Sequence, residues 1–315
     1  MRPGAEEYLR SQSARTMHGF EEDHVLAPEP VPLGIEALDK LLGGGIRPGG
    51  FTAIGGTAGT GKSALGTVAC YNAAAHGMFP LYISVEMDAH QVLARMASLH
   101  ASMIPRLDNF SWSNEHSIMR ACMPKDEAAR WEGKDEDERA ELAGDWLKRY
   151  GDKDNVLKAW RDMCARGIAD RVSIRDDVTS LDKVCEIVTN RAEYGIRDLV
   201  VVDYAQLLEA PGEKEYERIT EVAHGLRALC KEAGCPMLLI SSLRNLGKGD
   251  DEPELGWYRG SGHIGYDAFA AVVLMRGDVI DAGTVELKAH VIKNRFGTMG
   301  TAGGIGFKPC WNSIV

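Results

Sequence analysis

The sequence predicts an α/β fold whose sheet is mostly parallel and carries helices on both faces. Short, nearly continuous apolar runs recur along the 315 residues and alternate with segments typical of helices. Strands that are apolar throughout are expected where helices cover both sides of a sheet. In addition, a glycine-rich segment, IGGTAGTGKSALG at 54–66, lies between the first apolar run and an alanine-rich stretch, which indicates a strand, a loop and a helix in succession.

Seven segments are predicted as strands. The first five are apolar runs bounded by turn residues, which is typical of parallel strands in a covered sheet. The last two follow each other closely along the chain, which favours antiparallel additions to the same sheet. The predicted strands cover residues 51–56, 80–86, 171–177, 199–208, 236–243, 270–277 and 285–295.

Two regions interrupt this alternation. Residues 1–33 are polar and then proline-rich, and they predict an N-terminal arm and linker that is either disordered or packed on a neighbouring subunit. Residues 34–315 are expected to form one domain. Within it, the charged and tryptophan-containing segment at about 105–170 predicts a helical insertion. Nucleic-acid binding by this insertion is less favoured, because acidic residues are at least as frequent there as basic ones.

Composition limits the function classes. The formal net charge of −10 argues against nucleic acid binding over the whole outer surface, but it does not exclude a local basic channel. Seven cysteines without a CxxC pair argue against a disulfide framework or a zinc ribbon, and they fit a reducing compartment. No leader opens the chain, and no apolar run approaches the ~20 residues that cross a bilayer. We therefore expect a soluble, cytoplasmic protein without a membrane partner.

The glycine-rich segment has the spacing GxxxxGK[ST] of a phosphate-binding loop. Its glycines allow successive N–H groups to turn inward, and the following helix adds the positive end of its dipole. A glycine-rich turn with an accidental lysine is the alternative, which the flanking strand and helix disfavour. The predicted ATP-binding residues are Gly56, Thr57, Ala58, Gly59, Thr60, Gly61, Lys62 and Ser63.

Two carboxylates follow predicted strands and complete a hydrolytic site. Asp203 ends the apolar run that starts at 199, where it is expected to hold Mg²⁺ together with the Ser63 hydroxyl. Glu86 ends the strand at 80–86 and is expected to orient or deprotonate the attacking water, next to the catalytic Lys62. The alternatives are that Asp203 caps the next segment and that Glu86 caps a helix.

Cations near the last strand predict a contribution from a second subunit. Lys293 and Arg295 are two residues apart, so they share one strand face, and glycines follow them. Inserted into the ATP site of an adjacent subunit, they would act as an arginine finger and its companion, and otherwise they are surface cations. His263 is a single histidine without a second ligand at metal-binding spacing, so the sequence predicts no metal site there.

Taken together, these motifs resemble the motor domain of DnaB-type hexameric replicative helicases, within the RecA-like ATPases. The resemblance runs from about Gly34 to Phe307. Its further motifs are ISVEM at 83–87, VVDYAQLL at 201–208, RGSGHIGYDAFAAVVLMRGD at 259–278 and KNRFG at 293–297. It implies a RecA-like P-loop core, catalytic Glu86, Asp203 on Mg²⁺, and Lys293 with Arg295 acting in trans. It also implies that Arg259, Gly260, Ser261 and Gly262 contact the DNA backbone.

The sequence departs from the family in several ways. Ser242 stands where the family usually has a glutamine that is thought to relay the state of the γ-phosphate to the DNA loops. Ser63 replaces a common threonine, which is a minor change since either hydroxyl can ligate Mg²⁺. The family's N-terminal domain is not expected in this chain, and the insertion is additional. The chain is similar to compact stand-alone helicases of plasmids and phages.

The resemblance implies an ATP-dependent, ring-forming helicase that moves along single-stranded DNA in DNA replication. Its expected partners are single-stranded DNA, further copies of the chain in a hexamer, and a primase or loader. An oligomeric ATPase switch or loader of the clock-protein or recombination-mediator type remains the alternative. A nucleotide-binding scaffold with little turnover is disfavoured by the set of Lys62, Glu86, Asp203 and Arg295.

Overall fold

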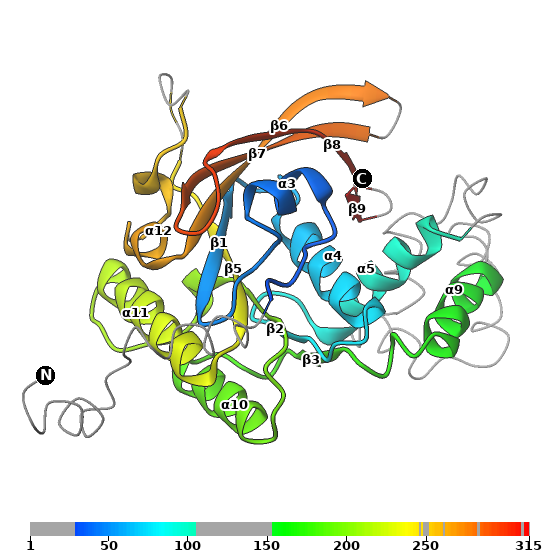
Figure 1. Cartoon of the computed structure of the whole chain (residues 1–315), viewed down its shortest axis with the longest axis horizontal. Coiled ribbons are helices and arrows are strands. Elements are labelled where there is room, and N and C mark those ends of the chain that lie inside the picture. The colour runs from blue at the N-terminus through cyan, green and yellow to red at the C-terminus, as the bar shows by residue number, and fades with distance from the viewer. Residues whose placement is uncertain are drawn as a thin grey trace, which may run out of the picture.

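The computed structural model describes residues 29–104, 153–245, 247, 252–260, 262–281, 284–309 and 312–314 (Figure 1). Their strands form one sheet in the order β3-β2-β4-β5-β1-β6-β7-β8-β9. The strands are β1 Gly50–Gly56, β2 Leu81–Ser84, β3 Ser173–Arg175, β4 Val200–Asp203, β5 Pro236–Ser242, β6 Ala270–Asp281, β7 Thr284–Asn294, β8 Gly300–Lys308 and β9 Ser313–Ile314. The helices are α3 Glu36–Leu41, α4 Lys62–Ala75, α5 Ala89–Ser102, α9 Lys153–Ala165, α10 Leu181–Glu193, α11 Glu215–Ala233 and α12 His263–Asp267, with short 3₁₀ turns η2 Ala205–Leu207 and η3 Leu255–Trp257.

The sheet has a parallel part and an antiparallel part. Strands β1 to β6 pair in parallel, and β7, β8 and β9 extend the sheet from β6 in antiparallel fashion. The predicted α/β class and the parallel core are therefore confirmed. Of the last two predicted strands, β7 is an antiparallel addition as expected, whereas β6 pairs with β1 in parallel and belongs to the parallel part. Strands β8 and β9 were not predicted, because GTAGGIGFK has four glycines and few apolar residues. Pairing with β7 stabilises β8 in a way that its own composition does not indicate.

Two predicted segments differ in the structure. The strand predicted at 199–208 ends at Asp203, and the apolar residues beyond it form η2. There the Gln206 side chain bonds to the end of β5, which holds the backbone in a turn outside the ladder. Of the predicted insertion, 153–165 form α9, and 105–152 lie outside the described residues. The predicted arm at 1–28 also lies outside them, whereas Val31 of the linker pairs with Ile46.

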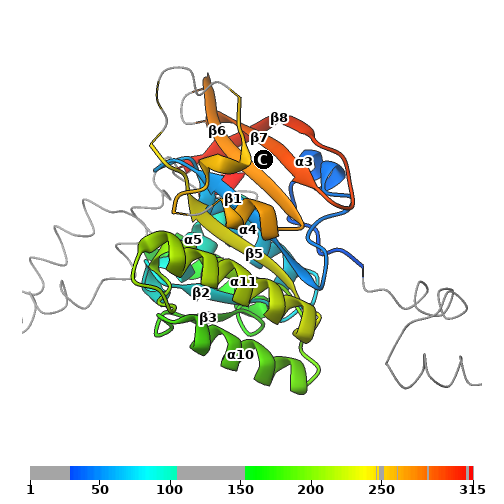
Figure 2. The ribbon, with the colours of Figure 1, turned by 90° about the vertical axis from the view of Figure 1, so that its left-hand side faces the viewer.

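Helices cover both faces of the sheet because alternate strand residues point to opposite sides. In β1, for example, Ile54 belongs to one buried apolar cluster and Ala53 to the other. The first cluster lies under α3, α4, α5 and α9, and the second under α10, α11 and α12 (Figures 1 and 2). Each cluster removes a large apolar area from water, which provides the main driving force for this fold.

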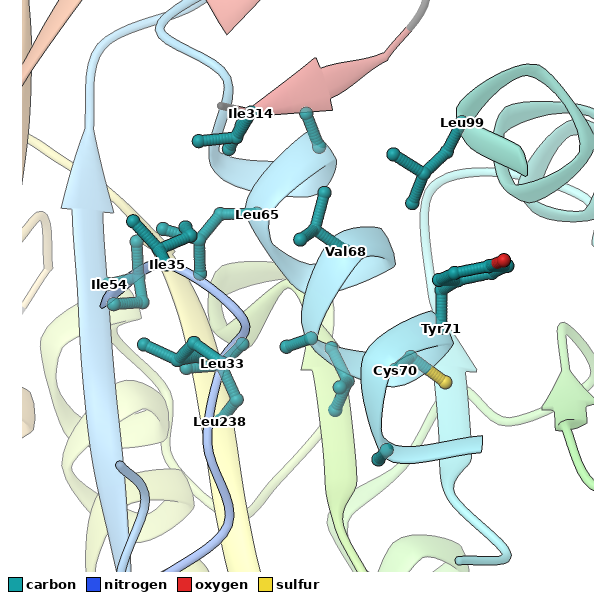
Figure 3. Close-up of a cluster of buried hydrophobic side chains, with 14 of the residues drawn as sticks. Leu33, Ile35, Ile54, Leu65, Val68, Cys70, Tyr71, Leu99, Leu238 and Ile314 are labelled. Atoms are coloured by element: carbon teal, nitrogen blue, oxygen red, sulfur yellow. The ribbon is translucent and has the colours of Figure 1, made fainter. Parts of the chain in front are cut away.

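Helix α4 is buried over most of its surface, and its position fixes the loop before it. Leu65 and Val68 lie in the first cluster, with Leu99 of α5 and Ile314 of β9 nearby (Figure 3). A Cβ atom at Gly66 would lie 2.8 Å from the side chain of Ile240, so glycine allows the helix to approach β5 closely. This packing holds the N-terminus of α4 at one edge of the sheet.

Hydrogen-bonded polar side chains link α4, α5 and α9. The Tyr71 hydroxyl lies 2.6 Å from Nδ1 of His100, and Nε2 of His100 lies 2.9 Å from the Asp162 carboxylate. Arg166 donates to the same carboxylate at 2.6 Å. His100 is 3% exposed, and burial lowers its pKa below the usual 6.5, although Asp162 acts in the opposite direction. The ring therefore binds a proton less readily in the folded chain than in the unfolded one.

This shift predicts a pH-dependent stability. Because the folded-state pKa of His100 is depressed, its contribution is present above about pH 6.5 and is lost as the pH falls through the folded pKa. We expect the thermal midpoint to fall more between pH 7.5 and pH 5, values chosen to bracket the usual pKa, in the wild type than in His100→Gln. A matched control is His76→Gln, whose ring is exposed, and it should keep the wild-type pH dependence. Equal pH dependence in the wild type and His100→Gln would contradict the assignment.

Candidate active site

The candidate site lies at the carboxyl edge of the parallel strands. The register aligns Gly56 at the end of β1 with Ser242 of β5, and Ser84 of β2 with Asp203 of β4. Parallel strands end at the same edge of a sheet, so the segments that follow them surround one space. That space is a pocket of about 600 Å³, here called the phosphate-loop pocket. Of the predicted ATP-binding residues, all except Thr60 line it.

The loop between β1 and α4 has the backbone of an anion cradle. Gly59 and Gly61 have φ angles of +73° and +90°, and Gly61 is the N-cap of α4. The Thr60 hydroxyl donates to the Thr57 carbonyl at 2.8 Å, which holds the loop from inside. A Cβ atom at Gly56 would lie 2.4 Å from that hydroxyl, so a side chain at 56 would displace it. Loop and helix dipole together present positive partial charge to the pocket.

Lys62 faces both predicted carboxylates across the pocket. Its Nζ donates to the Thr57 carbonyl at 2.8 Å. Burial lowers the pKa of Lys62, while the charges of Asp203 and Glu86 act in the opposite direction. The structure thus brings the loop cation and the two strand-end carboxylates together.

Asp203 offers an oxygen that suits a metal ion. Its side chain is 1% exposed, and one oxygen accepts from the Tyr82 hydroxyl at 2.7 Å. The other oxygen, Oδ1, is buried and has no hydrogen-bond partner within the described residues. Burial raises the pKa of Asp203, and the Tyr82 and Ser63 hydroxyls oppose that rise. An unpartnered carboxylate oxygen near a serine hydroxyl fits Mg²⁺, a hard cation that prefers oxygen ligands.

Glu86 lies in a turn and not at a strand end. Strand β2 ends at Ser84, whose hydroxyl bonds the backbone of Met87 and closes the turn. Glu86 lines the pocket from this turn. Helix α5 is capped by Asp88, whose carboxylate accepts from the Gln91 N–H at 2.8 Å. The alternative that Glu86 caps the helix is therefore wrong, because Asp88 does so.

Lys293 and Arg295 lie away from the pocket along the strands: the register puts Lys293 level with Ala53 in the middle of β1, and Arg295 beyond it toward the amino ends. Strand β7 runs antiparallel to β6 and pairs Lys293 with Ala271, whereas β6 meets the phosphate-loop end of β1 at Leu274. Lys293 Nζ donates to the Gly265 carbonyl at 3.0 Å and also to the Tyr266 carbonyl. The exposed Arg295 guanidinium lies 5.6 Å from the centre of the Phe269 ring. Neither side chain lines the pocket of its own chain.

The turn after Arg295 is anchored to the segment that precedes β1. Asn294 donates to the Leu41 carbonyl at 2.8 Å, and the Thr298 N–H donates to the same oxygen at 3.1 Å. The Arg47 guanidinium lies 5.1 Å from the centre of the Phe296 ring. These contacts fix the base of the turn on both sides of its exposed residues.

The predicted DNA-contacting segment is attached to the pocket. The Arg259 N–H donates to the Ser242 carbonyl at 2.9 Å, and its guanidinium pairs with Glu215 at 3.2 Å. Arg259 also lines the phosphate-loop pocket. Gly260 has φ +86° and packs on Ile219, and Gly262 precedes α12. Ser261 lies outside the described residues, and contact of this segment with DNA stays a prediction.

Gln206 joins three parts of the site. Its amide donates to the Ser241 hydroxyl at 2.8 Å and to the Arg259 carbonyl at 3.0 Å, and it accepts from the Ser242 N–H at 3.0 Å. It lies three residues after Asp203 and is 8% exposed. The Gln206 side chain therefore connects three segments: η2, which follows β4; the end of β5; and the segment of Arg259. Ser242, at the end of β5, stands where the resembled helicases usually have a glutamine.

Several further residues line the pocket that the sequence did not indicate, and three of them carry a charge or an aromatic ring close to the loop. They are Arg95 of α5, Arg276 of β6 and Phe307 of β8. The Arg276 guanidinium lies 5.8 Å from the centre of the Phe307 ring, and that ring lies beside Gly61. A cation at the end of the apolar run 270–275 could have indicated Arg276. Phe307 gave no signal, because β8 itself was not predicted.

A glycine loop that opens onto a buried acidic strand end in a parallel sheet is the arrangement of RecA-like ATPase domains, and the chain shares its fold with solved domains of this kind. The family model for the DnaB-like helicase C terminal domain matches residues 157–309, and the ATPase model described as KaiC matches 31–146. The chain is thus similar in sequence to DnaB-like helicases.

Two curated relatives illustrate the relationship. Replicative DNA helicase DnaB of Pasteurella multocida is 25% identical over 280 residues, which cover 86% of this chain and 52% of that protein. DNA repair protein RadA of Mycobacterium tuberculosis is 44% identical over 66 residues, 21% of this chain and 14% of that protein. The chain thus spans about half the length of this DnaB relative and a smaller share of RadA.

Solved structures share the fold over almost the whole chain. One of them, a separate ATPase domain, has a TM-score of 0.69 at 20% identity and covers 100% of this chain and 99% of that one. A DnaB-like replicative helicase, studied with its primase interactions, has a TM-score of 0.71 at 20% identity, covering 99% of this chain and 70% of that one. Among the described residues, no helix combines the length and apolar character needed to span a membrane.

Removing the Tyr82 hydroxyl should weaken the use of Mg²⁺. Tyr82→Phe leaves the second Asp203 oxygen without its donor, so the carboxylate loses its fixed orientation. We expect ATP turnover at low Mg²⁺ to fall by about 10- to 100-fold, as is typical when a group that orients a metal ligand is removed, and to recover partly at high Mg²⁺. Phosphate release as a function of Mg²⁺ concentration measures this. Tyr71→Phe removes a buried hydroxyl far from the pocket and should keep the wild-type Mg²⁺ dependence; an unchanged dependence in both variants would refute the role of Tyr82.

Proposed function

We propose that this chain is the motor domain of an ATP-dependent DNA helicase that assembles into a ring and moves along single-stranded DNA in replication. The observation that carries the proposal is the meeting of Lys62, Asp203 and Glu86 in one pocket beside a phosphate-binding loop. The relationship to DnaB-like helicases supports it for the activity. Since such an enzyme works on DNA in the cell interior, we infer a cytoplasmic location.

The residues of the pocket divide the work of ATP hydrolysis. The phosphates would lie over the N–H groups of the loop. Lys62 would exchange its hydrogen bond to the Thr57 carbonyl for contacts with the β- and γ-phosphates. Ser63 and Asp203 would hold Mg²⁺, which supplies positive charge to the phosphates when it is bound. Glu86, on its turn beside Lys62, would orient the attacking water and accept its proton.

Lys293 and Arg295 would complete the site of a neighbouring subunit. Neither side chain lines the phosphate-loop pocket of its own chain, and β7 carries Arg295 toward the amino ends of the parallel strands, away from that pocket. In a ring, the opposite edges of adjacent subunits face each other, which would put Arg295 near the neighbour's γ-phosphate. This geometry supports a homo-oligomer, which we propose to be a hexamer.

DNA would be contacted through the segment that contains Arg259. Gln206 links this segment to the end of β5 and to the strand of Asp203, so a change at the phosphates has a short hydrogen-bonded route to it. The segment also contains Gly260, Ser261 and Gly262. A primase or loader is a proposed partner by similarity to the DnaB-like helicase whose primase interactions have been studied.

An ATPase switch or loader without unwinding is the second candidate. The match of residues 31–146 to the KaiC model favours it, as does the short RadA match. Ser242 also lacks the amide that the family uses for coupling. Both candidates need the same nucleotide site, so only the action on DNA separates them.

Mixing two inactive variants tests whether Arg295 acts across an interface. Arg295→Ala should lower ATP turnover by on the order of 10³-fold, since arginine fingers contribute on this scale. Lys62→Ala should be inactive at its own site but still supply Arg295. A mixture should therefore recover more phosphate release than the sum of the two variants.

The matched control is Arg161→Ala, an exposed arginine on α9, which should keep the wild-type rate alone and in mixtures. Full turnover by Arg295→Ala alone, or a mixture that gives only the sum of its parts, would exclude a role in trans.

A forked DNA substrate separates the helicase from the switch. We expect the wild-type chain to separate the strands only with hydrolysable ATP, and Lys62→Ala to abolish both hydrolysis and separation. Solution mass with a non-hydrolysable ATP analogue and single-stranded oligonucleotide should show a ring. ATP hydrolysis without strand separation would favour the switch or loader and would overturn the helicase proposal.

A further inference from the structure

A second polar cluster lies away from the phosphate-loop pocket, between α11 and α12. It consists of His224 on α11 and His263 and Asp267 on α12, and one ligand atom from each lies within 4.8 Å of the others. The sequence did not indicate this grouping, because 39 positions separate His224 from His263. Both helices lie on the same side of the molecule (Figure 1). We call these three residues the α11–α12 cluster.

Asp267 directs an unsatisfied oxygen into this cluster. Its side chain is 7% exposed, and Oδ1 accepts from Arg227 at 2.8 Å. The second oxygen, Oδ2, is buried and lies 3.2 Å from Nε2 of His224, but no group within the described residues meets it with hydrogen-bond geometry. A buried oxygen without a well-aligned hydrogen bond destabilises the fold. A group that supplies a bond to Oδ2 would remove that destabilisation.

We propose that the α11–α12 cluster binds a divalent transition-metal ion of the Zn²⁺ type through His224, His263 and Asp267. Ligand atoms about 2.0–2.1 Å from a tetrahedral Zn²⁺ lie about 3.3–3.4 Å from each other. His224 Nε2 and Asp267 Oδ2 are 3.2 Å apart, which already matches one edge of that tetrahedron. His263 precedes Asp267 by four residues, so both project from one face of α12.

The ligand types and the nearby charges favour a transition-metal ion over Mg²⁺ or Ca²⁺. Two of the three ligands are imidazoles, which suit zinc-like ions and not Mg²⁺ or Ca²⁺. Arg227 holds the other Asp267 oxygen and so orients the carboxylate, as groups behind a metal ligand commonly do. Arg227 and Lys293 also repel a cation, so binding needs the coordinate bonds that imidazole forms with a transition metal. The exposed histidines leave a side open to water or a further ligand.

A bound ion would join α11 to the helix that anchors Lys293. The Gly265 and Tyr266 carbonyls that accept from Lys293 lie within α12, between the two ligands of that helix. A metal would therefore fix the position of this anchor. Only this consequence rests on the proposed role of Lys293 in trans, because the metal site itself depends on the three ligands alone.

Titration of the chelator-treated full chain tests the site. We expect one equivalent of Zn²⁺ to bind by calorimetry, and one equivalent of Co²⁺ to give the visible absorption of a tetrahedral nitrogen–oxygen site. His224→Gln and His263→Gln should each weaken binding by more than about 100-fold, beyond the 10- to 100-fold loss seen when only an orienting group is removed. Both rings are exposed, so these variants should fold normally, and far-UV circular dichroism checks this.

Two controls separate the cluster from other ligands. His76→Gln should bind Zn²⁺ like the wild type, because this exposed ring lies beside the end of α4. Lys62→Ala should also bind normally, which distinguishes this site from the Mg²⁺ site and from the proposed ATPase function. Absence of binding, unchanged binding in both cluster variants, or sulfur-to-cobalt charge-transfer bands from the cysteines would overturn the proposal.

Discussion

The alignment of parallel strand ends is the constraint on which the site depends. Because β1, β2, β4 and β5 run in the same direction, the glycine loop, Glu86 and Asp203 emerge at one edge although they are far apart in sequence. Helix α4 is buried against the sheet and keeps the loop at that edge. The chemistry of the pocket is therefore a consequence of strand direction and helix packing together.

The antiparallel strands add a second functional edge. A parallel extension would have carried Lys293 and Arg295 toward the phosphate-loop pocket, whereas β7 returns them to the opposite side. The same extension supplies Phe307 to the pocket through β8, since each reversal exchanges the edge at which a strand ends. One sheet thus presents the phosphate-loop pocket at the carboxyl ends of its parallel strands and Arg295 toward their amino ends, which fits the head-to-tail ring that we propose.

Local patterns were sufficient for most of the core and for the residues of the loop. The GxxxxGK[ST] spacing and the apolar runs depend on neighbours in sequence, so β1, α4 and the strand of Asp203 could be predicted. Contacts over long sequence distances could not. Phe307 reaches the pocket from a glycine-rich strand that only pairing stabilises, and His224 meets His263 across 39 positions. The sequence predicted Glu86 at the end of its strand, whereas the structure puts it in the turn after β2, because the Ser84 hydroxyl bonds the backbone of Met87.

The anchored turn after Arg295 has a consequence for assembly. Its base is tied to the Leu41 carbonyl by two donors, and Phe296 rests against Arg47. A side chain presented on a preformed support loses little conformational freedom when it docks, so less of the contact energy is spent on ordering. In the proposed assembly, copies of the chain would then associate as rigid bodies. Any cooperativity would arise from the nucleotide bound between them and not from folding of the turn.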